Sequence, residues 1–245
     1  MSPRVTLAVA GRVLTQLRRD HRTMAMLLVL PVLLMSLLWW MFEALPGDTF
    51  DRVGPALLAM FPFIIMFLVT SVTTLRERGS GTLERLLSMP LGKGDFLLGY
   101  ALAFGLVAAV QSVLAVSASV LLLGLEIQGP VVLLTVVAVA DAVLGTALGL
   151  LVSAFAQTEF QAVQFMPALV IPQILLCGLF VPRSGLPDVL GAISDVLPLS
   201  YAVDAMRLLT ATSDTGEVWN DLLVVCAFAV GSLVLGAATL RRRTA

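Results

Sequence analysis

Apolar residues form six long runs along the chain, and short polar or proline-rich segments separate them. The runs cover residues 24–42, 55–74, 96–123, 131–155, 162–181 and 222–240. A helix needs about 20 predominantly apolar residues to cross the roughly 30 Å hydrocarbon core of a bilayer, so each run is long enough to cross once. The pattern predicts an all-α membrane protein with six transmembrane helices in a single transmembrane domain over residues 1–245.

The segment 1–23, before the first run, has a helical pattern with two unlike sides. Val5, Val9, Val13 and Leu17 recur on one side at about 100° per residue. The basic residues occupy the other side: Arg4, Arg12, Arg18, Arg19 and Arg22. Such a helix lies in the membrane interface with its arginines toward anionic headgroups or a cytoplasmic partner. A basic segment that only sets the topology is the simpler interpretation, and the two are compatible.

The connection between the second and third runs reads LRERGSGTLERLLSMPLGKGDF. Glycines break the preceding helix, Thr82 can cap a new one and Pro90 stops it, which predicts a short helix over residues 83–89. Its apolar stripe is Leu83, Leu86 and Leu87. A helix this short is marginal alone in water. We therefore expect it to dock, either on the membrane helices of its own chain or in a groove of a cytoplasmic partner.

The connection between the fifth and sixth runs, residues 182–221, is long and apolar for a loop. Pro182 and Pro187 are expected to end the fifth transmembrane helix. Two short amphipathic helices should follow, one from Leu186 to Leu197 and one from Tyr201 to Leu209, with Pro198 between them. We predict that they re-enter the outer leaflet against the bundle, because irregular backbone at membrane depth must be covered by protein or border a cavity.

Three polar side chains fall inside the predicted transmembrane helices. Asp141 lies near the middle of the fourth, where a carboxylate costs about 2.5 to 3.5 kcal/mol on insertion scales and must face protein or water. A stripe of small residues follows it at four-residue spacing, which allows another helix to approach closely: Gly145, Gly149 and Ser153. Asp141 is either structural or part of a substrate or proton path. Gln111 and Gln173 are weaker cases of the same kind, typical of hydrogen bonds between helices.

Composition and charge agree with a membrane protein and orient it. The chain is 59% hydrophobic and 13% charged with a mean hydropathy of +1.00, whereas soluble domains are about 25% charged. Twelve basic residues fall in the N-terminal segment, the connection after the second run and the C-terminal tail, against three in the other connections. Because cytoplasmic segments retain positive charge, both termini are predicted to be cytoplasmic. Trp39, Trp40 and Trp219 lie at the predicted outer boundary, where amphipathic rings prefer to sit.

Several classes of function are disfavoured by the residues that the sequence lacks. Its single histidine and two cysteines cannot form a zinc site or a disulfide framework, and no Ser/His/Asp or Cys/His arrangement is present. The only lysine, Lys93, is followed by glycine, so there is no P-loop for ATP. A net charge of −1 gives no sign of nucleic-acid binding. We therefore expect no catalytic residue, cofactor or metal in this chain, with an intramembrane enzyme or assembly factor using Asp141 as the alternative of another class.

Two stretches of the sequence resemble a known family, the ABC-2 type permeases, which are membrane subunits of bacterial ATP-binding-cassette exporters. The stretch from Arg76 to Pro90 is similar to the family pattern E-x-G-T-L-E-x-L-x-x-x-P. The stretch from Gly178 to Arg207 is similar to G-x-x-x-P…P-x-x-L…P-L-x-Y-x-x-D-x-x-R. Gly79 and Ser80 depart from the pattern, because the family usually carries a second charged residue before the Gly-Thr pair.

The resemblance implies that residues 83–89 form a coupling helix in a cleft of a separate ATPase subunit, which would bind ATP and magnesium. The implied coupling residues are Glu77, Gly81, Thr82, Leu83, Glu84, Arg85, Leu86, Leu87 and Pro90. The outer block implies a re-entrant segment with Pro182, Pro198, Tyr201, Asp204 and Arg207. The N-terminal helix would also contact the ATPase.

The resemblance also implies how the chain would work in a cell. The functional unit would be two copies of this chain, or this chain with a paralogous permease, and two ATPases in the bacterial cytoplasmic membrane. The short loops resemble the drug-resistance branch of the family, which implies efflux of an amphipathic antibiotic or a lipid-like molecule. Export of a polysaccharide or other glycan is the alternative within the class.

Overall fold

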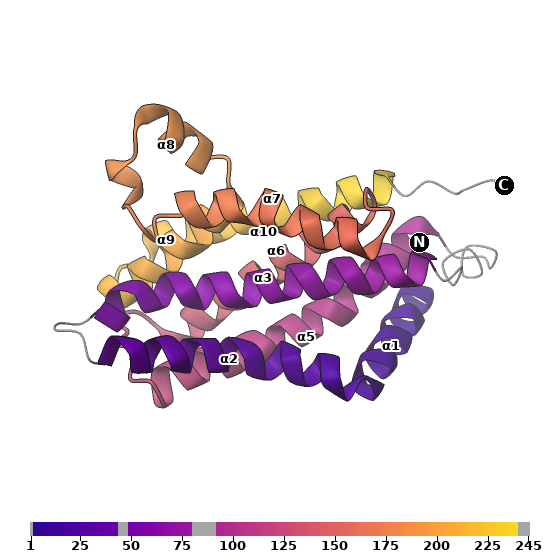
Figure 1. Ribbon diagram of the computed structural model, residues 1–245, viewed down its shortest axis with the longest axis horizontal. Helices are drawn as coiled ribbons and strands as arrows, with labels where there is room; N and C mark the ends of the chain where they lie inside the picture. Colours follow the sequence, from indigo (N-terminus) through magenta and orange to yellow (C-terminus); the bar gives the residue numbers. More distant parts are fainter. Residues whose placement is uncertain (1, 44–48, 80–91, 240–245) are drawn as a thin grey trace.

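The computed structural model describes residues 2–43, 49–79 and 92–239, and the ordered elements in these ranges are helical, with no strand. Six of the helices are long and apolar enough to cross a membrane, as the hydrophobic runs predict: α2 (His21–Glu43), α3 (Thr49–Gly79), α5 (Lys93–Leu121), α6 (Val131–Ser153), α7 (Glu159–Leu176) and α10 (Gly216–Thr239). Figure 1 shows them side by side as a bundle. The protein is therefore an all-α, multi-pass membrane protein.

Helix α1 (Pro3–Arg19) crosses one end of this bundle. Pro3 stands in its first turn, where a missing N–H costs nothing, and the buried side is the predicted apolar one. The helix stops at Asp20, whose carboxylate accepts from the backbone N–H of Thr23 at 3.1 Å and so caps α2. The interface helix is thus shorter than the predicted 1–23, because Asp20 turns the chain into the first transmembrane helix.

The centre of the bundle is α6, which packs against α3, α5 and α10. The predicted small-residue stripe makes the closest of these contacts. A Cβ on Gly145 would lie 2.4 Å from the Phe63 carbonyl oxygen, and one on Gly149 would lie 2.6 Å from that of Phe67. The prediction that this stripe admits another helix is confirmed, and α3 is that helix.

The predicted end of the fifth transmembrane helix is wrong. The fifth transmembrane helix was expected to continue to Val181, but α7 ends at Leu176. The proline at position 182 is not the cause, because Gly178 already takes the left-handed conformation (φ +91°), which ends a helix and favours glycine. A short 3-10 turn, η1 (Arg183–Gly185), follows Pro182 and leads into the outer segment.

The outer segment contains two helices that meet at a sharp bend. Helix α8 (Asp188–Ser194) is shorter than expected, and α9 (Pro198–Ala211) is longer, because Pro198 begins α9 at its first turn. The two helices are bent by 89°. Figure 1 shows α8 standing away from the bundle while α9 lies against it, and α9 packs on α3, α6 and α10.

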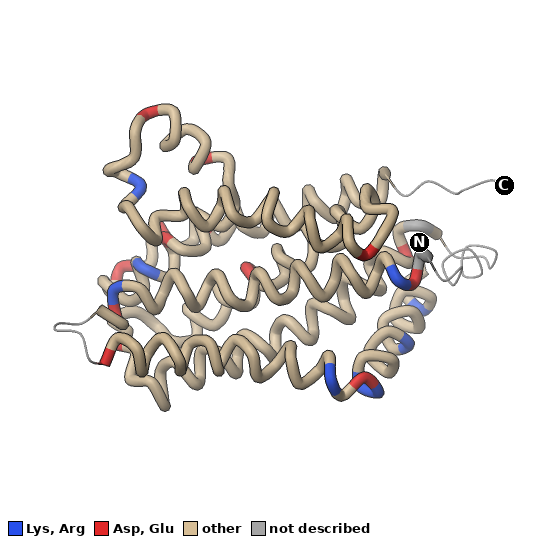
Figure 2. Tube along the Cα trace, viewed as in Figure 1, with Lys and Arg blue, Asp and Glu red and all other residues tan. Residues whose placement is uncertain are grey.

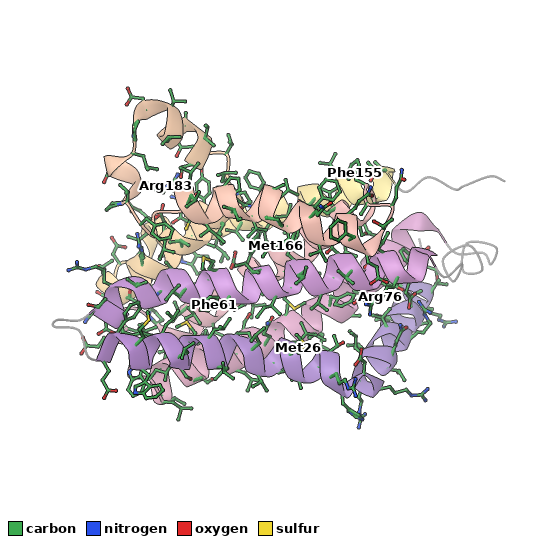
Figure 3. The ribbon with its side chains drawn as sticks, in the orientation of Figure 1. Met26, Phe61, Arg76, Phe155, Met166 and Arg183 are labelled. Atoms are coloured by element: carbon green, nitrogen blue, oxygen red, sulfur yellow. The ribbon has the colours of Figure 1, made fainter. Side chains whose placement is uncertain are left out.

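Charged residues gather at the two ends of the bundle (Figure 2). Helix α1, the start of α5 and the end of α10 share one end, and η1, α8 and α9 lie at the other. Figure 3 accordingly shows Arg76 and Arg183 at opposite ends. The described parts of the chain therefore place Glu77 and the segment 182–211 at opposite ends of the bundle.

Candidate functional site

At the end of the bundle that carries α1, three side chains from three helices meet. The guanidinium of Arg12 on α1 donates to the Glu77 carboxylate of α3 at 2.5 Å and to the Tyr100 hydroxyl of α5 at 2.9 Å. The Tyr100 hydroxyl donates to the same Glu77 oxygen. We call these three residues the clamp. The Glu77 side chain is only 8% exposed, so a charge-assisted network holds it in a nearly dry place.

A second attachment joins α1 to the first turn of α5. The Asp95 carboxylate accepts from the Ser2 backbone N–H at 2.9 Å and from the Thr6 hydroxyl at 3.1 Å. Helices α1 and α5 are also very close at Gly99, where a Cβ would lie 2.6 Å from the Val9 side chain and 3.0 Å from the Thr6 carbonyl oxygen. The small size of glycine lets α1 pack flat against α5 here.

The two attachments flank residues 80–91. Glu77 lies just before this segment and Asp95 just after it, and α1 holds both. Glu77 is the one implied coupling residue whose position is described. The other implied coupling residues lie outside the described part of the chain: Gly81, Thr82, Leu83, Glu84, Arg85, Leu86, Leu87 and Pro90. A displacement of this segment would therefore act on α3, α5 and α1 together.

The surroundings of Arg12 favour its charged form. Burial alone would lower the pKa of Arg12. The hydrogen bond to Glu77 and the nearby negative charge together raise it by more, so the pKa of Arg12 lies above its ordinary value. A cavity of about 360 Å³ opens beside the clamp and reaches Asp20 and Arg76. Arg76 itself pairs with Glu159 of α7 at 2.9 Å on the exposed surface. Helix α3 is thus tied at this end to α1, α5 and α7.

Two of the predicted intramembrane polar residues have no hydrogen-bond partner among the described residues. Asp141 on α6 and Gln111 on α5 are both completely buried, and neither carboxylate oxygen nor carboxamide atom is paired. The neighbouring Ser112 hydroxyl donates to the Ala138 carbonyl at 3.0 Å, which joins α5 to α6 within one turn of both side chains. Burial away from lipid agrees with either interpretation of Asp141.

Replacing Asp141 by asparagine is expected to leave most of the transport activity that the sequence resemblance implies, because asparagine keeps the volume and hydrogen-bonding capacity of the buried group without its charge. Export and protein level in the membrane, measured together, check this structural interpretation. A complete loss of export at a normal protein level would contradict it and place Asp141 in the transport path.

Gln173 joins α7 to the start of α9. Its amide donates to the Leu169 carbonyl at 3.1 Å, and its carbonyl accepts from the Leu199 N–H at 3.3 Å. This contact supports the first turn of α9, whose N–H groups have no partner within the helix.

Among the outer residues, the structure brings Tyr201, Asp204 and Arg207 together with one that sequence reasoning did not single out, Arg183. The Arg183 guanidinium pairs with Asp204 and, at 2.5 Å, with Asp195, and it lies 5.0 Å from the centre of the Tyr201 ring. Arg207 instead donates to the Gly178 carbonyl at 2.6 Å. Of the two predicted prolines, Pro182 directly precedes η1 and Pro198 is the first residue of α9. Arg183 thereby fixes the bend between α8 and α9.

Sequence reasoning missed Tyr100, Asp95 and Arg183 as functional positions. The signal for Tyr100 was weak but present, since it is one of only two tyrosines and lies in an apolar run. In the described ranges no group of three or more His, Cys, Asp or Glu side chains could hold a metal. The arrangement at the α1 end joins α1, α3 and α5 through one charged network.

Comparison with known proteins gives a consistent picture. The family described as "ABC-2 type transporter" matches residues 4–210. The chain is 30% identical to the probable multidrug ABC transporter permease YbhR of Escherichia coli over 74% of this chain and 50% of the relative. It is 25% identical to the probable multidrug ABC transporter permease YbhS of Escherichia coli, over 74% of this chain and 48% of the relative. It is also 25% identical to ABC transporter G family member 20 of Dictyostelium discoideum, over 81% of this chain and 28% of the relative. The match thus covers about half the full length of the bacterial relatives and 28% of the Dictyostelium relative.

Proposed function

Because the chain belongs to the ABC-2 type transporter family, we propose that it is the permease subunit of an ATP-binding-cassette exporter. In this proposal two permease chains, either two copies of this one or this chain and a paralogue, surround a central path through the bacterial cytoplasmic membrane. The chain catalyses no reaction itself. A separate ATPase subunit binds ATP and magnesium and supplies the energy, in agreement with the absence of a P-loop from the sequence.

The observation that carries the proposal is the double attachment of α1 on either side of residues 80–91. Closure of the ATPases around ATP would push the predicted coupling helix 83–89. Glu77 and Asp95 would pass that displacement to α3 and α5, while α1 moves with both. The bundles would then rock between inward-open and outward-open packings, which is an ordinary shift between two states biased by a ligand.

The proposed cargo is an amphipathic drug or antibiotic, or a lipid-like molecule, moved outward. Two of the relatives carry the printed description "multidrug". An apolar path with methionine and phenylalanine side chains suits such molecules, because methionine adapts to ligands of different shape.

Co-purification from the native host tests the proposal directly. A tagged chain extracted in mild detergent should bring an ATPase subunit in roughly equal amount, and candidate drugs should then stimulate ATP hydrolysis by the complex. A chain that purifies without any nucleotide-binding partner, even after gentle crosslinking, would contradict the permease assignment.

Charge reversal at the predicted coupling helix gives a sharper result. Glu84→Lys with Arg85→Glu should leave membrane insertion intact and remove most drug-stimulated ATP hydrolysis and export, because the contacts to the ATPase would be repelled. Asp188→Lys, an exposed change at the opposite end of the bundle, is the control and should behave as wild type. Normal export by the double variant would show that residues 83–89 do not couple the two subunits.

The proposed orientation has its own test. After replacement of both native cysteines, a cysteine at exposed Asp214 should react with an impermeant maleimide on intact spheroplasts. A cysteine at exposed Thr15 on α1 should react only after the membrane is permeabilised. The reverse pattern would place both termini outside the cytoplasm.

A further inference from the structure

A cavity of about 550 Å³ lies at the end of the bundle opposite α1, among the start of α3, the connection before α6, the turn after α7 and the end of α9. Its wall has a charged part and an apolar part. Charged residues form one part, namely Asp51, Arg52, Glu126 and Arg207, and apolar residues that include Phe180 form another. Phe180 is 66% exposed, so the cavity opens beside an apolar surface.

The frame of this cavity is held by hydrogen bonds between its walls. The Glu126 N–H donates to the Asp51 carboxylate at 3.0 Å, which ties the connection before α6 to α3. The Gly129 N–H donates to the Leu209 carbonyl at 2.8 Å and fastens the same connection to α9. The bond from Arg207 to the Gly178 carbonyl fastens α9 to the turn after α7. The cavity is therefore formed before any ligand arrives.

The charges that line it are incompletely satisfied by the described residues. Arg207 donates one guanidinium N–H to the Gly178 carbonyl, but its buried Nε has no hydrogen-bond partner among the described residues. The side chains of Arg52 and Glu126 are exposed and form no ion pair within the described ranges. Two guanidinium groups and two carboxylates thus face one cavity, and beyond the bond from the Glu126 N–H to Asp51 and the bond from Arg207 to Gly178 they have bonding capacity left over. Guanidinium groups match phosphate oxygens, and a carboxylate matches an ammonium group.

We propose that this outer cavity binds the headgroup of a zwitterionic phospholipid such as phosphatidylethanolamine. Arg52 and Arg207 bind the phosphate, Glu126 binds the amine, and an acyl chain follows the surface beside Phe180. A lipid is favoured over a soluble zwitterion because the cavity lies at the ends of transmembrane helices, at headgroup depth, with an exposed apolar wall. The site depends on the cavity alone and does not require the proposed transport.

Lipid binding to the purified full-length chain in detergent, without ATP or cargo, tests the site. Native mass spectrometry and the thermal shift on addition of lipid should show preferential retention of phosphatidylethanolamine over phosphatidylglycerol. Arg52→Gln with Glu126→Gln should weaken phosphatidylethanolamine binding about tenfold or more, as expected for the loss of charge-assisted hydrogen bonds. Both side chains are exposed, so the fold should be unaffected. Arg4→Gln with Asp188→Asn removes the same charges at exposed positions elsewhere and should bind as wild type.

Three results would overturn the inference. The first is equal phosphatidylethanolamine binding by the Arg52→Gln, Glu126→Gln variant and the wild type. The second is equally tight binding of phosphatidylglycerol, which would indicate that only the shared phosphate is recognised and that Glu126 does not bind the amine. The third is stabilisation by soluble glycerophosphoethanolamine that phosphatidylethanolamine cannot displace, which would indicate a soluble ligand. Failure of co-purification with an ATPase would leave the lipid site untouched, so the two proposals fail separately.

Discussion

Replacing Gly145 by alanine is expected to abolish correct folding of the bundle. The new Cβ would lie 2.4 Å from the Phe63 carbonyl oxygen and 3.1 Å from the Phe63 Cα. These are backbone atoms of α3 that cannot rotate away, so α3 and α6 would have to separate. Overpacking of this kind costs about 3 kcal/mol or more, and a bilayer offers little hydrophobic driving force to restore the contact.

The measurement is the monodisperse fraction and the melting temperature of the detergent-extracted protein. Gly149→Ala should behave similarly, since its Cβ would lie 2.6 Å from the Phe67 carbonyl oxygen. Gly105→Ala is a matched control in a transmembrane helix, because its Cβ would meet only the Val143 side chain at an ordinary 3.8 Å. Wild-type stability of Gly145→Ala would mean that α3 and α6 do not pack in this register.

The Gly145 contact also shows what kind of information the sequence holds. Four-residue spacing of small side chains predicts that some helix comes close on that side of α6, because the pattern reports the shape of one helix surface. It does not say that the neighbour is α3, since five other apolar runs could satisfy the same pattern. The lengths of the runs similarly predict the six transmembrane helices but not their order around the bundle.

The clamp could not be predicted for a related reason. Arg12, Glu77 and Tyr100 come from three helices, and their meeting depends on how each helix is rotated about its axis. The sequence places Arg12 on the polar side of α1, which suggests solvent or headgroups rather than a buried carboxylate. Arg183 was missed in the same way, since its partner Asp195 directly follows α8 and its partner Asp204 lies on α9, and the chain bends by 89° between these two helices.

The ends of α1 depend on local signals that the prediction of residues 1–23 did not use. Pro3 stands in the first turn and the Asp20 carboxylate caps the next helix, and both residues are visible in the sequence. The end of α7 was misassigned because hydropathy continues to Val181, whereas the backbone of Gly178 already leaves the helix. A glycine in an apolar run can continue the helix or take the left-handed conformation that ends it. Tertiary contacts decide between the two, and here Arg207 donates to the Gly178 carbonyl.

Removal of one charge from the clamp should have the second large effect. Arg12→Gln deprives the nearly buried Glu77 of its guanidinium partner. Because the Arg12 side chain is itself 35% exposed, the expected cost is about 2 kcal/mol, between the costs of a buried and an exposed pair. The double variant Arg12→Gln, Glu77→Gln should recover most of this loss, because no charge then remains to be desolvated. Thermal unfolding in detergent measures both effects, and export measured alongside should fall in Arg12→Gln if α1 helps to transmit the displacement.

The pair Arg76 and Glu159 supplies the matched control. It also joins two helices, at 2.9 Å, but its side chains are 63% and 51% exposed. Arg76→Gln should therefore cost less than about 1 kcal/mol, as exposed pairs do. Equal losses for Arg12→Gln and Arg76→Gln would show that burial does not distinguish the two pairs. The variant Arg12→Gln, Glu77→Gln could instead be fully stable and yet fail to export. That result would mean that coupling between permease and ATPase needs the two charges themselves and not only the packing of α1.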